Sequence, residues 1–238
     1  VGSEMCIRDR SNHQLESNEE KLKKKTGGRK VHTTLAFVHT YPDGDRDFSF
    51  YRNPGADMML RKEEVSLEKI CASKIFHFGT LSFTHAGIRT ASQYAIQCAK
   101  EAGALISFDP NLREPLWENL EDARKAIEYG MECCDILKIS DNELTFMTGE
   151  KDYDKGAVLL QQKYQIPLVC VTLGKDGSRA YYKGLTIKAE PFLQKNTIET
   201  TGAGDTFTGY FLMAQEKGFS AEQCLSIAAQ ASAIAVSR

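Results

Sequence analysis

From Lys74 to its end the chain alternates short apolar runs with segments of helical period, and this alternation restricts the fold more than any other feature. Strands are expected near 74–78, 104–108, 135–139 and 168–173, and helices near 84–102, 121–130, 141–147 and 155–164. Two short strands follow near 180–182 and 186–188, and helices near 205–217 and 220–236 close the chain. Strands joined by helices of this length form βαβ units. The pattern therefore predicts an α/β fold with a mostly parallel sheet sandwiched by helices.

The segment before this core has a different pattern. Residues 33–38 and 47–51 are predicted to be strands joined by a turn at 42–45. We therefore expect residues 31–53 to form part of a small β lid beside a core at 54–238. Residues 1–30 hold few apolar side chains and a lysine run, which favours a disordered or non-native leader. The alternative is a basic tail for nuclear import or nucleic acid.

Composition excludes several classes of protein. Thirty basic and 32 acidic residues give a net charge of −2, so no global field attracts nucleic acid or an anionic membrane. No apolar run approaches the roughly 18 residues of a membrane span. Seven cysteines lack C-x-x-C spacing and have no zinc-ligand pattern with the five histidines. We expect a protein of a reducing compartment, the cytoplasm, with the plastid as the alternative.

The most informative segment precedes the helix near 205–217. Small residues at Gly202, Ala203 and Gly204 let backbone N–H groups converge where a helix begins, which makes an anion hole for phosphoryl oxygens. Asp205 then lies in the first turn, where its carboxylate can take a proton from an attacking hydroxyl. The alternative, to which spacing alone gives equal weight, is a tight turn with Asp205 as a helix cap.

Three further segments follow predicted strands, where α/β sheets bind ligands. Thr172, Gly174 and Gly177 could cradle a nucleotide phosphate or simply turn the chain. Glu143 could hold Mg²⁺ through waters or complement a helix dipole. Arg113 could fork onto a phosphate or stabilise a loop. The Walker and dinucleotide fingerprints are absent from the sequence.

Six motifs together resemble the ribokinase-like, or PfkB, family of ATP-dependent carbohydrate kinases, and within it the fructokinases. They are 34–38 (TLAFV), 50–57 (FYRNPGAD), 108–113 (FDPNLR), 138–143 (KISDNE), 171–177 (VTLGKDG) and 200–205 (TTGAGD). They occur in family order across residues 31–238. The resemblance implies a ribokinase-like fold and transfer of phosphate from ATP to a sugar.

The resemblance also implies roles for single residues. Asp205 would be the catalytic base, and the amides of Gly202, Ala203 and Gly204 would form the anion hole. Thr172, Gly174 and Gly177 would approach the ATP phosphates, Glu143 would organise Mg²⁺, and Arg113 with Asn111 would face the substrate and the transferred phosphate. The hairpin would be a lid that closes over the sugar and excludes water. Such lids often dimerise, so a homodimer is expected.

The sequence departs from the family pattern at three places. Ser140 stands where the family's N-x-x-E motif has Asn, a form that fructokinases resemble. Glu199 replaces the usual Asp in a position that, with Thr201, often helps to bind a monovalent cation, so K⁺ is a candidate ligand. The family's N-terminal Gly-Gly-Asn-type sugar motif and its last C-terminal segment have no counterpart. We therefore expect a fragment of a longer fructokinase-like chain, with little or no kinase activity by itself.

These observations favour an ATP-dependent kinase that converts D-fructose to fructose 6-phosphate. Two alternatives remain open from the sequence. One is a non-catalytic sugar- or nucleotide-binding protein on the same fold, and the other is a family kinase for another sugar or nucleoside.

Overall fold

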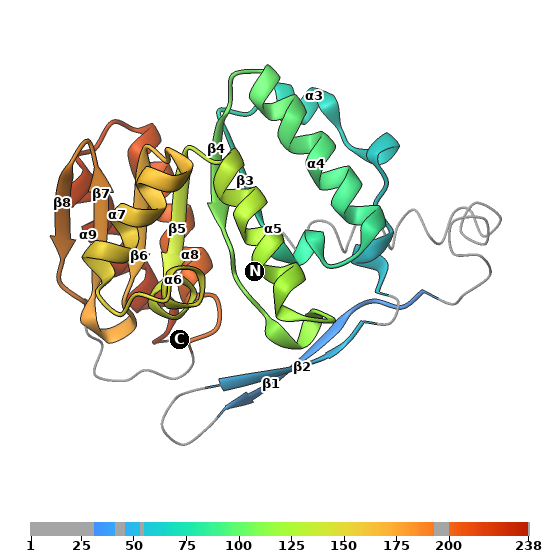
Figure 1. Cartoon of the computed structure of the whole chain (residues 1–238), viewed down its shortest axis with the longest axis horizontal. Coiled ribbons are helices and arrows are strands. Elements are labelled where there is room, and N and C mark those ends of the chain that lie inside the picture. The colour runs from blue at the N-terminus through green and yellow to red at the C-terminus, as the bar shows by residue number, and fades with distance from the viewer. Residues whose placement is uncertain (1–30, 41–45, 53–54, 193–199, 238) are drawn as a thin grey trace.

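The computed structural model of the chain describes residues 31–40, 46–52, 55–192 and 200–237. The predicted leader at 1–30, the turn at 42–45 and Glu199 lie outside the described residues. Within the described ranges the strands form two sheets, a six-stranded sheet in the core and a two-stranded hairpin that projects below it (Figure 1).

The larger sheet is mostly parallel. Its strand order is β3-β4-β5-β6-β7-β8, with parallel pairing from β3 to β6 and antiparallel pairing from β6 to β8. The strands are β3 (Ile75–Gly79), β4 (Leu105–Asp109), β5 (Ile136–Ser140), β6 (Leu168–Thr172), β7 (Ser178–Tyr182) and β8 (Leu185–Ala189). Each lies within two residues of its predicted position. The predicted α/β fold is confirmed.

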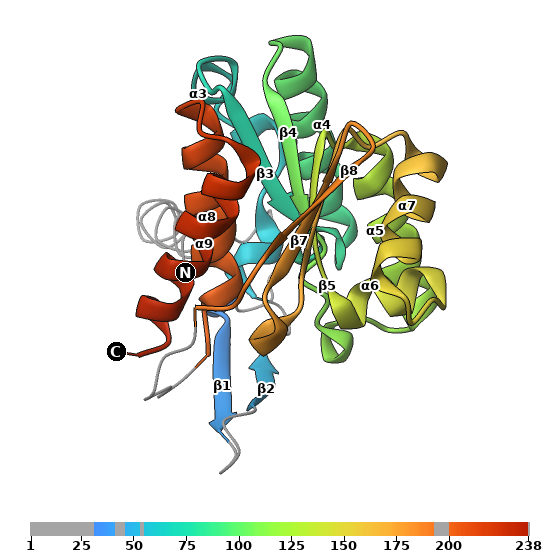
Figure 2. The same ribbon diagram turned by 90° about the vertical axis from the view of Figure 1, so that its left-hand side faces the viewer.

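Helices cover both faces of this sheet (Figure 2). On one face lie α4 (Ala86–Glu101), α5 (Leu120–Cys133), α6 (Asp141–Thr148) and α7 (Tyr153–Tyr164). The short helix α3 (Leu67–Cys71) contacts α4. On the other lie α8 (Ala203–Glu216) and α9 (Ala221–Ala235). Short 3₁₀ helices occupy Ala56–Met59, Lys62–Glu64, Thr80–Phe83, Glu114–Leu116 and Gly174–Asp176.

Two apolar clusters fill the space between sheet and helices. The cluster under α4–α7 contains Phe108 and Ile127, both with no exposed surface. The cluster under α8 and α9 contains Cys170 and Leu225, which are equally buried. Because side chains alternate along a strand, Phe108 points into the first cluster and its neighbour Asp109 points to the α8 side.

One glycine fixes how closely α5 approaches the sheet. A Cβ on Gly130 would lie 2.2 Å from Cζ of Phe108, and the centre of the Phe108 ring in turn lies 4.8 Å from that of the tilted Phe78 ring. The helix therefore rests directly on an aromatic pair that precedes the carboxyl ends of β3 and β4.

The hairpin consists of β1 (Leu35–Thr40) and β2 (Arg46–Tyr51), paired antiparallel with Leu35 opposite Tyr51. The first strand begins two residues later than the predicted start at residue 33. The physical reason is that the preceding residues are held by the core, since His32 bridges Gly55 and the Thr34 hydroxyl donates to Asp57.

A buried arginine anchors the base of the hairpin. Arg52 follows β2, and its Nε lies 2.7 Å from Oδ2 of Asp57. Its other nitrogens donate to Thr84 Oγ1 at 2.8 Å and to the Leu81 carbonyl at 3.1 Å. The Asp57 carboxylate thus accepts hydrogen bonds from Thr34, which precedes β1, and from Arg52, which follows β2. One carboxylate therefore attaches both strands to the core.

No helix among the described residues has the length and apolarity that a membrane span requires.

Candidate active site

The predicted functional segments meet at the carboxyl edge of the sheet. Ser140 at the end of β5 pairs in register with Thr172 at the end of β6. The loop after β4 reaches α6, because the Leu112 N–H donates to Oε1 of Glu143 at 2.7 Å. The start of α8 joins them, since a Cβ on Gly204 would lie only 3.4 Å from Nζ of Lys138 on β5.

The first turn of α8 begins with a glycine in the left-handed region. Gly202 has φ 78° and occupies the N-cap position, a conformation that favours glycine. The Ala203 N–H donates to the Thr200 carbonyl at 3.2 Å. In the described part of the chain, no backbone acceptor outside the helix takes the N–H of Gly202 or Gly204, and the first turn of a helix supplies none inside it. Two small-residue amides are therefore available to an anion.

Asp205 is the third residue of α8, and it is exposed. The Asp205 charge acts on side chains of two strands, His77 in β3 and Asp109 at the end of β4. It opposes the lowering of the His77 pKa that burial causes, and it adds to the raised pKa of Asp109. The carboxylate therefore stands at the edge of a group of ionisable side chains and not on an isolated helix face.

The centre of this group is an ion pair that the sequence motifs did not reveal. Lys138 Nζ lies 3.0 Å from Oδ2 of Asp109, and their side chains are 11% and 6% exposed. Burial raises the pKa of Asp109 to about 6; Lys138 opposes this shift, and Glu143 and Asp205 add to it. Burial lowers the pKa of Lys138, but the carboxylates of Asp109 and Glu143 outweigh burial, so the net shift is upward. The sequence signal was a charged residue at the inward position of two neighbouring apolar strands.

Glu143 ties the two loops of the site together. Besides the Leu112 N–H, its carboxylate accepts the Ser140 N–H at 2.9 Å and the Ser140 hydroxyl at 2.8 Å, both at Oε2. The side chain belongs to a residue only 8% exposed. Three of the roughly four lone-pair positions of the carboxylate are thus occupied. One position at Oε1 remains to accept a hydrogen from a metal-bound water, which fits Mg²⁺ held through its water shell and not by direct coordination.

The described residues contain no cluster of three or more His, Cys, Asp or Glu side chains that could hold a metal.

Arg113 and Asn111 lie in the loop that follows β4. The Asn111 N–H donates to Oδ1 of Asp109 at 3.2 Å, and Asn111 has a positive φ of 45°. Arg113 donates to the Leu112 carbonyl at 3.1 Å, and its guanidinium stacks 5.1 Å from the ring centre of Phe48 on β2. This residue therefore contacts the hairpin.

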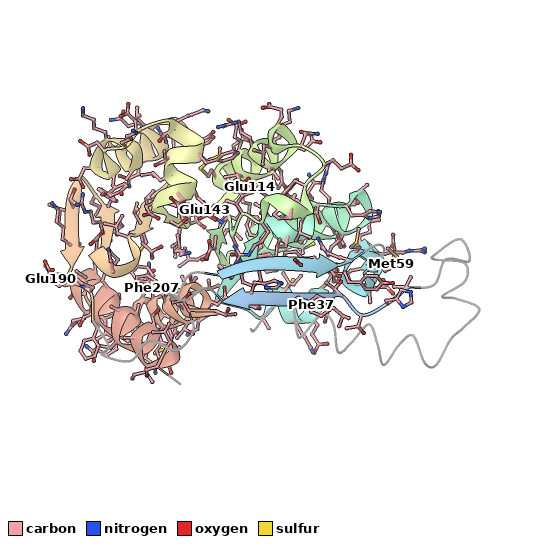
Figure 3. All side chains as sticks on the ribbon, turned by 90° about the horizontal axis from the view of Figure 1, so that it is seen from below. Phe37, Met59, Glu114, Glu143, Glu190 and Phe207 are labelled. Atoms are coloured by element: carbon pink, nitrogen blue, oxygen red, sulfur yellow. The ribbon has the colours of Figure 1, made fainter. Side chains whose placement is uncertain are left out.

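A cavity of about 250 Å³ opens beside this loop. Its lining residues are Leu112, Arg113, Glu114, Ser140, Asn142, Glu143 and Phe146. Figure 3 shows Glu114 and Glu143 close together on the core, with Phe37 on the neighbouring hairpin. The cavity thus lies between the loop after β4 and the start of α6.

The turn after β6 carries two glycines with positive φ, Gly174 at 56° and Gly177 at 86°. A Cβ at Gly174 would meet nothing within 4 Å, whereas one at Gly177 would lie 2.3 Å from the Ala189 carbonyl oxygen. Gly174 therefore leaves open space beside Thr172, and Gly177 allows the chain to pass β8 closely. Of the two residues predicted to hold a monovalent cation, Thr201 lies in the turn before α8 and Glu199 falls outside the described residues.

Comparison with protein families gives one match over most of the chain. The pattern of the pfkB family carbohydrate kinases matches residues 20–238. Probable fructokinase-2 of Arabidopsis thaliana is 47% identical over 180 residues, which are 76% of this chain and 54% of the relative. Fructokinase-2 of Solanum lycopersicum is 44% identical over 180 residues, 76% of this chain and 55% of the relative. The chain thus spans about half the length of the curated relatives it matches.

Solved structures of fructokinases are also similar to this chain. The fructokinase with bound ATP from Xylella fastidiosa is 30% identical, with a TM-score of 0.76 over 87% of this chain and 68% of that one. A fructokinase double mutant from Vibrio cholerae, in its fructose-, ADP- and potassium-bound form, is 27% identical, with a TM-score of 0.76 over 88% of this chain and 69% of that one.

Proposed function

Because the chain belongs to the pfkB family of carbohydrate kinases, we propose that it serves an ATP-dependent kinase that converts D-fructose to fructose 6-phosphate. The observation that carries this proposal is the start of α8, where the amides of Gly202 and Gly204 stand next to Asp205 at the carboxyl edge of the sheet. Fructose is the sugar named for the relatives with 44% and 47% identity.

In the proposed reaction Asp205 accepts the proton of the sugar hydroxyl while the hydroxyl oxygen attacks the terminal phosphorus of ATP. The oxygens of the moving phosphoryl group gain charge, and fixed N–H dipoles stabilise that charge without reorganisation. Gly202 and Gly204 supply two such groups. Ala203 remains a prediction in this role, because its N–H would have to exchange the Thr200 carbonyl for the phosphoryl oxygen.

The nucleotide is proposed to lie between the turn after β6 and the start of α8. The open space at Gly174 lets phosphate oxygens approach the backbone near Thr172 and Gly177. Bound Mg²⁺ would neutralise the charge of the phosphates, and Glu143 would accept a hydrogen from its water shell. Arg113 and Asn111 are proposed to face the transferred group, and K⁺ is proposed at Glu199 and Thr201.

The hairpin is proposed as the lid over the sugar. Phe48 on β2 already contacts Arg113 in the loop of the site, so closure would shield the reacting phosphate from water. Strand β1 presents Leu35, Phe37 and Val38 with 47%, 57% and 42% of their surface exposed. We propose that this apolar strand contacts a second copy of the chain. Phe37→Asp should then convert the dimer to a monomer, which analytical ultracentrifugation would detect.

The six described cysteines are all unpaired. This agrees with the proposed location in the cytoplasm, a reducing compartment.

The proposal is tested with the full-length protein, because this chain spans only about half the length of its relatives. The protein is incubated with ATP, Mg²⁺ and D-fructose, and both ADP and sugar phosphate are measured. Glucose, ribose and adenosine serve as parallel acceptors. Fructose should give the highest kcat/KM. Turnover that is equal for all acceptors, or faster for adenosine, would overturn the assignment of fructose.

The role of Asp205 is tested with Asp205→Asn. Asp122→Asn is a matched control, because Asp122 is also the third residue of a helix, α5, and is exposed. Asp205→Asn should lower kcat by about 10²–10⁴, the usual contribution of general-base catalysis, whereas the control should retain kcat. Equal rates for both variants would rule out Asp205 as the base.

A further inference from the structure

The buried pair of Asp109 and Lys138 lies directly below the first turn of α8. Asp109 ends β4 and is 4% exposed, and the Lys138 side chain on β5 is 11% exposed. The pairing of Phe108 with Leu137 places the two charged residues side by side on neighbouring strands. Both side chains face α8, and the oxygen and nitrogen are 3.0 Å apart.

A pair of this kind does little for stability alone. Two charges lose their hydration when they are buried, and the free energy of their attraction often does no more than offset that desolvation cost. Apolar side chains of similar size would hold the two strands together at least as well. The strands around the pair are apolar, with Phe108, Leu137 and Ile139 showing no exposed surface.

The position of the Lys138 ammonium is also electrostatically unfavourable when no anion is bound. Nζ of Lys138 lies where a Cβ on Gly204 would be 3.4 Å away. The start of a helix carries partial positive charge, which repels a cation. The ammonium is therefore held beside a positive dipole, and the carboxylates of Asp109 and Glu143 compensate it. The ammonium and the positive end of the helix dipole thus lie close together, and an anion bound at the start of α8 would interact favourably with both.

We propose that Asp109 is a positioning residue that holds the Lys138 ammonium against Gly204, so that Lys138 adds a full positive charge to the anion-binding start of α8. This inference rests on the proposed function, because it takes the phosphates of ATP as the anion. Asp109 acts only through Lys138, while Lys138 faces the phosphates.

The test compares the affinities of ATP and adenosine by calorimetry. The variants are Lys138→Met, Asp109→Asn and the double variant, with Lys74→Met as control. Lys74, just before β3, forms an exposed pair with Glu216 at the opposite end of α8, so its loss removes an ammonium that contacts the same helix without touching the site. Urea unfolding of every variant reports stability separately.

Lys138→Met should weaken ATP binding about tenfold or more, the usual effect of a charge-assisted contact, and leave adenosine binding within about twofold. Asp109→Asn decides the positioning role. If Asp109 served only to neutralise charge, its removal would strengthen ATP binding, since a negative group near an anion is lost. A positioning residue predicts weaker binding, because the ammonium is no longer held at Gly204.

The double variant separates function from folding. It removes both members of the ion pair, so neither is left buried without its partner, and its unfolding free energy should return toward that of the wild type. Its ATP affinity should stay as low as that of Lys138→Met. ATP binding that recovers together with stability would overturn the inference, as would tighter ATP binding by Asp109→Asn. Lys74→Met should bind ATP like the wild type.

Failure of the proposed function has a different outcome. A full-length protein that binds ATP with the expected pattern but phosphorylates no sugar would refute the kinase reaction and leave the pair's role intact. A wild type that binds ATP no better than adenosine would overturn the role of the pair.

Discussion

Substitution of Gly130 by alanine tests whether close contact between α5 and β4 determines the stability of the core. An alanine in the middle of a helix is normally favourable by about 1 kcal/mol relative to glycine. Here the added Cβ would lie 2.2, 2.5 and 2.6 Å from Cζ, Cε1 and Cε2 of Phe108, whereas carbon atoms in contact are about 3.5–4.0 Å apart. Helix propensity and packing therefore make opposite predictions.

The packing effect should dominate. The Phe108 side chain has no exposed surface, and the ring of Phe78 lies 4.8 Å away, so the ring has little space into which it can retreat. Overpacking of a core costs about 1–3 kcal/mol, and the severity of this contact places the cost at or above the upper limit. After subtraction of the propensity gain, Gly130→Ala should destabilise the protein by roughly 2 kcal/mol.

Urea unfolding followed by circular dichroism measures this effect. With a slope of about 2 kcal/mol per molar urea, the midpoint should fall by roughly 1 M. Gly209→Ala is the matched control, because Gly209 lies in the middle of α8, is exposed, and a Cβ added there would meet nothing within 4 Å. That variant should gain up to about 1 kcal/mol.

The reasoning would be refuted if Gly130→Ala were as stable as the wild type or gained stability as Gly209→Ala does. Phe108→Leu in the Gly130→Ala background gives a second check. The smaller side chain leaves space for the methyl group, so the two substitutions together should cost less than the sum of their separate effects.

Three other substitutions have defined outcomes. Gly177→Ala forces a Cβ onto a residue with φ 86°, and should cost about 1–3 kcal/mol in urea unfolding and weaken ATP binding in calorimetry; an unchanged midpoint would contradict the steric argument. Arg52→Lys keeps the charge but loses the forked contacts of the hairpin anchor, so amide exchange in β1 and β2 should accelerate, and unchanged protection would show that the anchor is dispensable. Lys138→Met removes the group that opposes the raised pKa of Asp109, so that pKa should rise further above its ordinary value of 3.8. The folded state then binds more protons than the unfolded state, and the variant should become more stable as the pH falls from 8 to 5, by at most about 1.4 kcal/mol per pH unit; a flat unfolding profile would be inconsistent with a buried Asp109 carboxylate.

The periodic parts of the sequence predicted the fold well, because the pattern of apolar residues there matches the burial of each side chain in the structure. Cys170 and its neighbours in β6 are apolar on both sides, as a central strand covered by two helical layers requires. The bounds were less accurate where side chains from elsewhere intervene. The start of β1 depends on Asp57, which lies beyond the hairpin and holds Thr34, and no local pattern contains that contact.

For the site, the motifs identified the segments but not the contacts between them. The segments with Glu143 and Leu112 were both predicted to line the site, yet only the structure shows that the carboxylate of the first binds the backbone of the second. The pair of Asp109 and Lys138 was missed because its two residues lie in separate motifs. Their proximity follows from strand register, which the sequence of either strand alone does not determine.

Because a single carboxylate anchors both hairpin strands, the length of the hairpin and its attachment to the core can change independently. Asp57 and Arg52 lie at the base, and their contacts are with Thr34, Thr84 and the Leu81 carbonyl. Adding matched pairs of residues farther along the ladder would lengthen the hairpin without altering any of these contacts. The reach of the hairpin can therefore diverge among descendants while its attachment and the core remain the same.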